Sequence, residues 1–290
     1  MKLLDRNDIT DIWNKLYWNV WKASEWINVE DSRNIAREST KEFYEFLKNF
    51  GINVNYSFWN DSEEKFPEII NAIKNYIETW EVSDVIPLLW LWNHQSFWLE
   101  AMGLYDYFPI NWRPLLKDEL LLPPYFWKWI EAIDPIVYFR RMAKINPKEV
   151  FFYLLKKFFL DKKYLTSRKE RNNEIQKTIL EKKAVLIYPE WTRSKTWELL
   201  KFREWLYKPA YDILSKEAEW FSNKIAIITS DTHDIFPTTL EKVLLRKWEI
   251  YRWEVNIKID IIEIETWENI KHFNKRVYDI IKWNLQKKEQ

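Results

Sequence analysis

The sequence predicts an α/β fold, a mixed central sheet flanked by helices, with a helical segment in front of it. The clearest strand is the run 184–187, which is short, apolar and β-branched and lies between two lysines and a proline. Comparable apolar runs recur along the chain, at 84–89, 136–139, 225–229 and 255–261. Segments of helical periodicity lie between them, such as 148–160 and 172–183. Strands that alternate with helices are typical of the α/β class.

The first part of the chain is expected to be helical. Apolar residues recur at helical spacing within 9–20 and 43–50, and Asp61 opens a further helix that carries isoleucines from Ile69 to Ile77. No catalytic constellation lies here. We therefore divide the chain into an N-terminal helical segment, 1–80, and an α/β domain, 81–290. Within that domain, the alternating run 255–261 is expected at an edge of the sheet, and 269–283 as the closing helix.

The composition limits the classes of function. A chain of 290 residues can bury one large core, and its net charge of +1 does not call for nucleic acid as a partner. The absence of cysteine excludes disulfides and thiolate metal sites, and no metal is expected. The first residues are charged and do not resemble a signal peptide, and no window approaches about 18 uninterrupted apolar residues. We expect a cytoplasmic protein, soluble or peripheral to the inner face of a membrane.

Two groups of polar residues follow predicted strands. The run 84–89 leads into Asn93-His94-Gln95-Ser96, where the imidazole is placed to act as a general base, or is a satisfied structural histidine. The run 184–187 leads into Tyr188-Pro189-Glu190-Trp191-Thr192-Arg193-Ser194. A carboxylate, an arginine and two hydroxyls within five residues suit an anionic group at the carboxyl end of a strand, where open α/β sheets bind ligands.

These two motifs resemble those of the glycerolipid acyltransferase family, the 1-acylglycerol-3-phosphate acyltransferases and their relatives. That family carries Asn-His-x-Ser and Phe-Pro-Glu-Gly-Thr-Arg-Ser, and here both occur in the same order, about 95 residues apart. The resemblance covers about residues 84–260. It implies that His94 deprotonates the acceptor hydroxyl, with Asn93 and Ser96 at the substrate. Trp191 stands where the family has glycine.

The histidine motif departs from the family in its carboxylate. The family places an aspartate five residues after the histidine, and Leu99 occupies that position here, with Glu100 next to it. If Trp98 is glycine, a bulge or a turn of positive φ can absorb the extra residue. We then expect Glu100 to hold the imidazole in its catalytic tautomer, as in other His–carboxylate pairs.

A third region resembles the family's second motif. It holds Lys117-Asp118-Glu119-Leu120, then Pro124-Tyr125-Phe126-Trp127, then a short strand that ends at Arg140. Arg140 best matches the arginine that the family uses against the acceptor's phosphate, because a guanidinium grips phosphate bidentately; Arg141 is the next candidate. The alternative is a solvated basic pair at a strand end. Phe139 stands where the family often has an aspartate.

The sequence is poor in glycine and rich in tryptophan. Average usage of about 7% would give roughly 20 glycines, whereas the chain has 2 Gly and 20 Trp. Trp127, Trp191 and Trp205 fall on family glycines, the last in Lys201-Phe202-Arg203-Glu204-Trp205, which resembles Pro-Phe-Lys-x-Gly. We interpret these positions as UGA codons that the source translates as glycine. The alternative is a protein that is rich in tryptophan.

The segment 148–171 has an aromatic stripe beside lysines, with 8 basic and 3 acidic side chains counted along the printed sequence. It is typical of a helix on anionic lipid, or of an ordinary helix that covers the sheet.

The resemblance implies acyl transfer from acyl-CoA or acyl carrier protein, as co-substrate, to lysophosphatidic acid or a related glycerol phosphate. Arg140 and Arg193 would hold the phosphate, with Glu190 and Thr192 in the same pocket, and no cofactor would be needed. The alternatives are a glycerol-3-phosphate acyltransferase and a peripheral lipid-binding protein that has lost the base–carboxylate pair.

Overall fold

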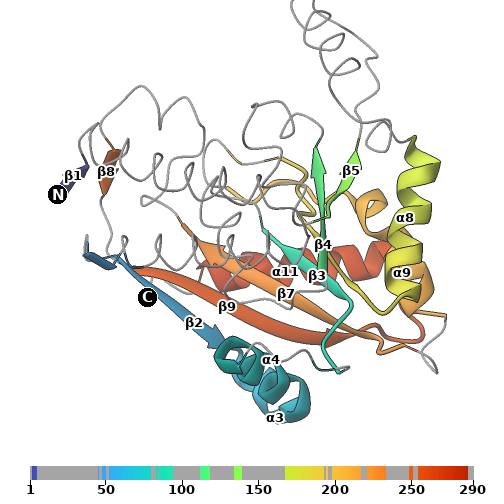
Figure 1. The fold of residues 1–290 in the computed structure, drawn as a ribbon, viewed down its shortest axis with the longest axis horizontal. Coiled ribbons are helices and arrows are strands. Elements are labelled where there is room, and N and C mark those ends of the chain that lie inside the picture. The colour runs from blue at the N-terminus through green and yellow to red at the C-terminus, as the bar shows by residue number, and fades with distance from the viewer. Residues whose placement is uncertain are drawn as a thin grey trace, which may run out of the picture.

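The computed structural model places a seven-stranded sheet at the centre of the chain, with strands in the order β2-β9-β7-β3-β6-β4-β5 (Figure 1). The residues that the structure describes are 2–4, 45, 48–49, 52–79, 83, 85–93, 112–117, 134–138, 167–192, 194, 198–216, 221–232, 248–250 and 254–286. In sheet order the strands are β2 (Asn53–Phe58), β9 (Glu254–Glu263), β7 (Lys224–Asp231), β3 (Leu89–Trp92), β6 (Ala184–Ile187), β4 (Trp112–Lys117) and β5 (Ile136–Tyr138). A separate antiparallel pair joins β1 (Lys2–Leu4) to β8 (Trp248–Ile250).

The sheet is mixed, as the sequence predicts. Strands β5, β4, β6, β3 and β7 are mutually parallel. Strand β9 is antiparallel to β7, and β2 is parallel to β9. All five parallel strands therefore end at one edge of the sheet, which is the edge where both predicted polar motifs begin.

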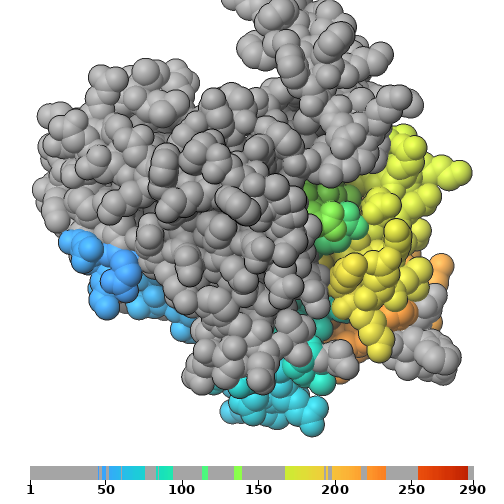
Figure 2. Space-filling view, viewed as in Figure 1, coloured from blue at the N-terminus to red at the C-terminus, as the bar shows by residue number. Residues whose placement is uncertain are grey.

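Helices α8 (Arg168–Leu180), α9 (Lys208–Leu214) and α11 (Ile270–Gln286) cover one face of the sheet. The other described helices are α3 (Asn60–Lys65), α4 (Pro67–Thr79) and the 3₁₀ turn η3 (Glu204–Leu206). Residues of α8, α9 and α11 form one buried cluster with alternate residues of β3, β6 and β7. Figure 1 shows α8 and α9 together at the β5 end of the sheet, and in the space-filling view α8 lies at the molecular surface beside β5 (Figure 2).

Both ends of α8 are fixed by local hydrogen bonds, and its C-terminal end determines where β6 starts. A capping box begins the helix: Glu170 N donates to Ser167 Oγ at 3.2 Å, and Ser167 N donates to the Glu170 carboxylate at 2.5 Å. At the other end Lys182 N bonds Ile179 O and Lys183 N bonds Thr178 O, and Lys182 has a φ of 56°. This Schellman geometry stops the helix and turns the chain directly into β6.

Three elements differ from the sequence expectations. Residues 53–58, expected to be helical, form β2 and pair in parallel with β9, so β9 lies inside the sheet and the predicted edge position is wrong. Strand β3 starts at Leu89 and not near residue 84. The helix opened at Asp61 is present as α3 and α4, and the division of the chain at residue 80 stays a prediction.

Of the described helices, none is long and apolar enough to cross a membrane.

A buried carboxyl in β9 makes stability depend on pH. Asp260 is 5% exposed, and Asn284 Nδ2 donates to its Oδ2 at 2.7 Å. Burial raises the pKa of Asp260 from its usual 3.8 to about 6, against the opposing effects of Asn284 and Lys258. The folded state therefore binds this proton more tightly than the unfolded state, so the carboxyl's contribution to stability grows as pH falls from above 6 towards 4.

We predict that Asp260→Asn raises the free energy of unfolding at pH 8 by on the order of 3 kcal/mol, since about two pKa units are worth about 1.36 kcal/mol each. The amide keeps an oxygen acceptor for Asn284 and removes the charge. Urea unfolding of both proteins at pH 8 and pH 4 measures the effect, and the gap should nearly close at pH 4. An equal gap at both pH values would show that Asp260 does not titrate in this range.

Candidate active site

The two polar motifs leave neighbouring parallel strands. Leu91 of β3 is paired with Ile187 of β6, and one residue further on the rings of Trp92 and Tyr188 lie 6.2 Å apart. The next described strand after β3 is β4, which lies beyond β6, whereas the strand after β6 is β7, which lies beyond β3. Connections that leave adjacent strands towards opposite sides define the switch point at which open α/β sheets bind ligands.

Asn93 connects the end of β3 to the end of β7 by hydrogen bonds. Its Nδ2 donates to Ser230 O at 2.9 Å, and its Oδ1 accepts from Ser230 N at 2.8 Å. Both residues are fully buried, and Trp92 Nε1 donates to Ser230 Oγ at 2.9 Å. The amide of Asn93 is thus used inside the protein, where it fixes the backbone from which His94 follows; substrate contact by Asn93 stays a prediction.

Glu190 holds the loop that follows β6. Its side chain is 2% exposed, and its Oε2 accepts from Leu200 N at 2.7 Å. Pro189 O accepts from Arg203 N at 2.7 Å, which ties the same loop down a second time. The stretch that contains Thr192, which is exposed, and Ser194, which is buried, is therefore closed at its base by both bonds.

Trp191 occupies a left-handed backbone conformation. Its φ is 65°, and its N–H donates to Tyr188 O at 3.0 Å in a tight turn. This region is a genuine outlier for a bulky side chain and is ordinary for glycine. The indole packs edge-on against Tyr138 at 5.0 Å and against Trp205 at 5.8 Å, and Tyr138 and Trp205 are 5.5 Å apart. We call these three rings the ring cluster.

Two rings of the cluster, those of Tyr138 and Trp205, contact Arg171 of α8. The Arg171 Cζ lies 5.0 Å from the Tyr138 ring and 5.1 Å from the Trp205 ring, and the side chain is fully buried. Burial lowers the pKa of Arg171 to about 10. Arg171 belongs to the basic segment 148–171, which was expected either on anionic lipid or over the sheet. Lipid contact is wrong for this residue, because the rings of Tyr138 in β5 and Trp205 in η3 cover it.

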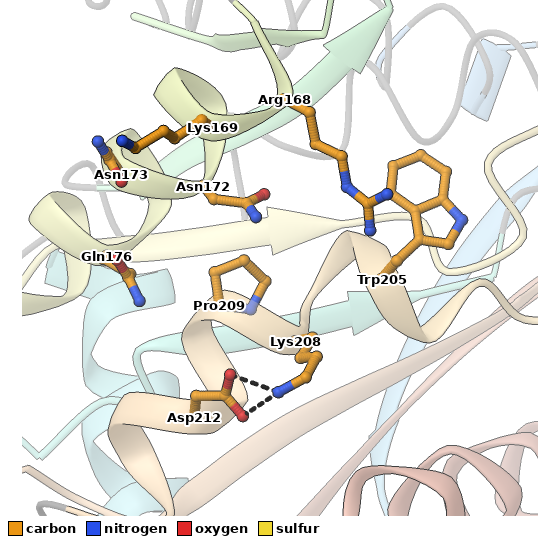
Figure 3. A pocket seen from close by; sticks show the side chains of 9 residues that line it. All are labelled: Arg168, Lys169, Asn172, Asn173, Gln176, Trp205, Lys208, Pro209 and Asp212. Carbon is orange, nitrogen blue, oxygen red and sulfur yellow. Dashed lines mark hydrogen bonds and ion pairs between the residues drawn. The ribbon is translucent and has the colours of Figure 1, made fainter.

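A cavity of about 540 Å³ lies beside the ring cluster, between α8 and α9 (Figure 3). Its walls come from α8, α9 and η3. They are formed by Arg168, Lys169, Asn172, Asn173, Gln176, Trp205, Lys208, Pro209 and Asp212. Lys208 Nζ pairs with the Asp212 carboxylate at 2.5 Å, while Arg168 Cζ lies 5.7 Å from the Trp205 ring. The wall carries three cationic and one anionic side chain, so it favours an anionic group.

The structure thus brings Asn93, Glu190 and Thr192 to one edge of the sheet. The predicted residues His94, Ser96, Glu100, Arg140 and Arg193 lie outside the described residues. In the sequence, His94 directly follows Asn93, Arg193 directly follows Thr192, and Arg140 stands two positions after Tyr138. Within the described part of the chain no cluster of metal-ligating side chains occurs. The burial of Arg171 could not be predicted, because the sequence places it in a run of charged residues.

Comparison with known proteins supports the fold. Neither a protein-family model nor a curated protein matches the sequence. Among solved structures, the crystal structure of the 1-acyl-sn-glycerophosphate (LPA) acyltransferase PlsC from Thermotoga maritima matches with a TM-score of 0.56 at 13% identity. The match covers 97% of this chain and 93% of that chain. The chain therefore has the α/β fold of that acyltransferase, over nearly the full length of both.

Proposed function

We propose that this protein is an acyltransferase that moves a fatty acyl group from acyl-CoA or acyl carrier protein to the hydroxyl of lysophosphatidic acid or a related glycerol phosphate. It would act in phospholipid biosynthesis, in the cytoplasm and peripheral to the inner face of the membrane. One observation carries the proposal: the strands that lead into the Asn93-His94 and Glu190-Trp191-Thr192 motifs are adjacent and parallel, so both motifs begin at one switch point. The likeness to an LPA acyltransferase over 97% of the chain supports it.

The proposed acyl transfer needs a general base and a group that binds the acceptor's phosphate. The acceptor oxygen attacks the thioester carbonyl as His94 takes the hydroxyl proton. The carbon–sulfur bond then breaks, and the thiolate takes the proton back from the imidazolium, so no covalent enzyme intermediate forms. Glu100 would orient the imidazole, Ser96 would lie at the substrate, and Arg140 and Arg193 would hold the acceptor's phosphate. Glu190 acts on the loop, since its carboxylate binds Leu200 N.

Loss of thioester should therefore require an acceptor. The assay offers lysophosphatidic acid and glycerol 3-phosphate separately, with acyl-CoA and acyl carrier protein as donors. Turnover with the first acceptor alone supports the proposal, and turnover with the second alone favours a glycerol-3-phosphate acyltransferase. No turnover with either, together with binding of the lysolipid, would favour the peripheral lipid-binding alternative, which the missing aspartate at Leu99 motivates.

We predict that His94→Ala lowers turnover by about 10²–10⁴-fold, the usual contribution of a general base. Glu100→Gln should lower turnover strongly without weakening lysolipid binding. The double variant should be little worse than His94→Ala, because residues that act as a unit are not additive. Leu99→Asp restores the family spacing and serves as the control. If Glu100→Gln is silent while Leu99→Asp raises activity, the base works unpaired and Glu100 has no catalytic role.

We also propose that the source translates many of these tryptophans as glycine. The φ of 65° at Trp191 supports this, because a left-handed conformation costs a residue with a Cβ about 1–2 kcal/mol. Trp90 and Trp92 differ, since both are buried in β3 and their indole N–H groups donate to Pro87 O and Ser230 Oγ. Peptide masses of the native protein decide the matter at Trp98, Trp127, Trp191 and Trp205, and tryptophan at all four would end the proposal.

Stability gives a second, independent measure of the glycine proposal. We predict that Trp191→Gly is more stable than Trp191→Ala by about 1 kcal/mol, because only glycine adopts positive φ without cost. At Trp205, which lies in the helical turn η3, the order should reverse, with alanine ahead by about 0.5–1 kcal/mol. Urea unfolding of the four variants measures both differences. If the alanine variant is the more stable one at both positions, the backbone conformation of Trp191 no longer supports glycine there.

We also propose that the basic segment 148–171 contacts anionic membrane through residues 148–166, which lie outside the described residues. Replacing four lysines by glutamine should release the protein from anionic vesicles at modest salt, since each is worth about 1 kcal/mol near the surface. These are Lys156, Lys157, Lys162 and Lys163. The control replaces four exposed lysines elsewhere, Lys65, Lys271, Lys275 and Lys282. Equal co-sedimentation of both quadruple variants and the parent would assign the segment to covering the sheet.

A further inference from the structure

Arg171 is a buried cation whose counter-charge is missing from the described part of the chain. Its Nε donates to Asn172 Oδ1 at 3.1 Å, and its Nη2 donates to the same oxygen. For Nη1, no described residue supplies a hydrogen-bond partner, and none of the described carboxylates forms an ion pair with this guanidinium. Buried charges are normally paired, because an uncompensated one costs several kcal/mol. An anion is therefore the group that this position lacks.

Trp205 of the ring cluster lies next to both Arg171 and the cavity. Its side chain lines the cavity between α8 and α9 (Figure 3). The Arg171 Cζ lies 5.1 Å from the centre of the same ring. Asn172, the acceptor for Arg171, lines the same cavity. On the other side, Trp191 packs against both Tyr138 and Trp205 and closes the cluster towards the turn after β6. Glycine at Trp191 and Trp205 would remove two of the three rings and extend the cavity to the guanidinium.

We infer that Arg171 is a phosphate-binding residue, in a site that the indoles of Trp191 and Trp205 cover in the chain as written. The inference rests on the proposed function in taking both tryptophans as glycine and the phosphate as part of a substrate. The site lies at the ends of β5 and β6, beside the turn that carries Glu190 and Thr192.

The chemistry of the site suits a phosphate monoester. A guanidinium with a free Nη1 offers paired donors to two phosphate oxygens. Arg168 adds a second cation, since its Cζ lies 5.7 Å from the same Trp205 ring. Two such charges match the charge of about −1.5 to −2 of a phosphate monoester at neutral pH. The phosphate could belong to the acceptor or to the carrier of the acyl donor, and the two sources are separable by kinetics.

The first experiment measures binding of inorganic phosphate by calorimetry, without any acyl donor. The full-length double variant Trp191→Gly/Trp205→Gly should bind phosphate more tightly than the parent. In that background, Arg171→Gln should weaken binding by about 10- to 100-fold, the value of a hydrogen bond to a charged group. Arg171→Lys should fall between the two, because it keeps the charge and loses the fork. Lys271→Gln removes one exposed charge on α11 and should change nothing.

Circular dichroism and urea unfolding of each variant confirm that the fold is retained. Equal phosphate affinity with and without the Arg171 guanidinium, or no phosphate binding by the double variant, would overturn the inference. The thioester assay then shows which substrate carries the bound phosphate. Arg171→Gln should raise the KM for lysophosphatidic acid if the phosphate belongs to the acceptor, and the KM for acyl-CoA if it belongs to the donor. An unchanged KM for both would overturn the assignment of the phosphate to a substrate. If phosphate binding depends on Arg171 but no variant transfers an acyl group, the phosphate site is supported and the proposed acyltransferase function is wrong.

Discussion

Burial of the central parallel strands is the constraint on which the rest of the structure depends. Every residue of β3 and β6 is buried, so neither strand can carry a polar side chain without an internal partner until it leaves the sheet. The first polar residues therefore come at the carboxyl ends, Asn93 after Trp92 and Glu190 after Pro189. Because the two strands are adjacent and parallel, both sets emerge at the same edge. The position of the candidate site is a consequence of how the sheet packs.

At that edge, one residue of each motif positions the backbone. Asn93 joins β3 to β7 through two hydrogen bonds to the main chain of Ser230. Glu190 holds Leu200, at the far side of the loop that contains Arg193. In binding and catalytic sites generally, buried hydrogen-bonded residues of this kind fix the positions of the residues beside them. The two motifs thus combine a fixed, buried residue with an adjacent residue of the type that reacts or binds.

The sequence predicted the elements whose signal is local. The runs that became β6, β7 and α11 have strong apolar patterns, and the two polar motifs could be placed after strands because the strands were clear. Strand β2 was missed although Val54, Tyr56 and Phe58 alternate with polar residues. Its partner is β9, with Asn55 and Asn256 separated by 201 positions, so the interior place of β9 depends on a pairing that no local pattern contains. The burial of Arg171 depends likewise on rings from β5 and η3.

The ring cluster and Arg171 beside it show two features that are unusual in natural proteins. A bulky residue has positive φ at Trp191, and a cation is buried without a counter-charge among the described residues at Arg171. Local and global preferences normally agree, and departures gather at functional sites. Trp90 and Trp92 show that tryptophan as such is not the difficulty, since both are buried with their N–H groups satisfied. Glycine at Trp191 would relieve the backbone, and glycine at Trp191 and Trp205 together would open a path to Arg171, whereas a tryptophan-rich chain needs a separate compensation for each irregularity.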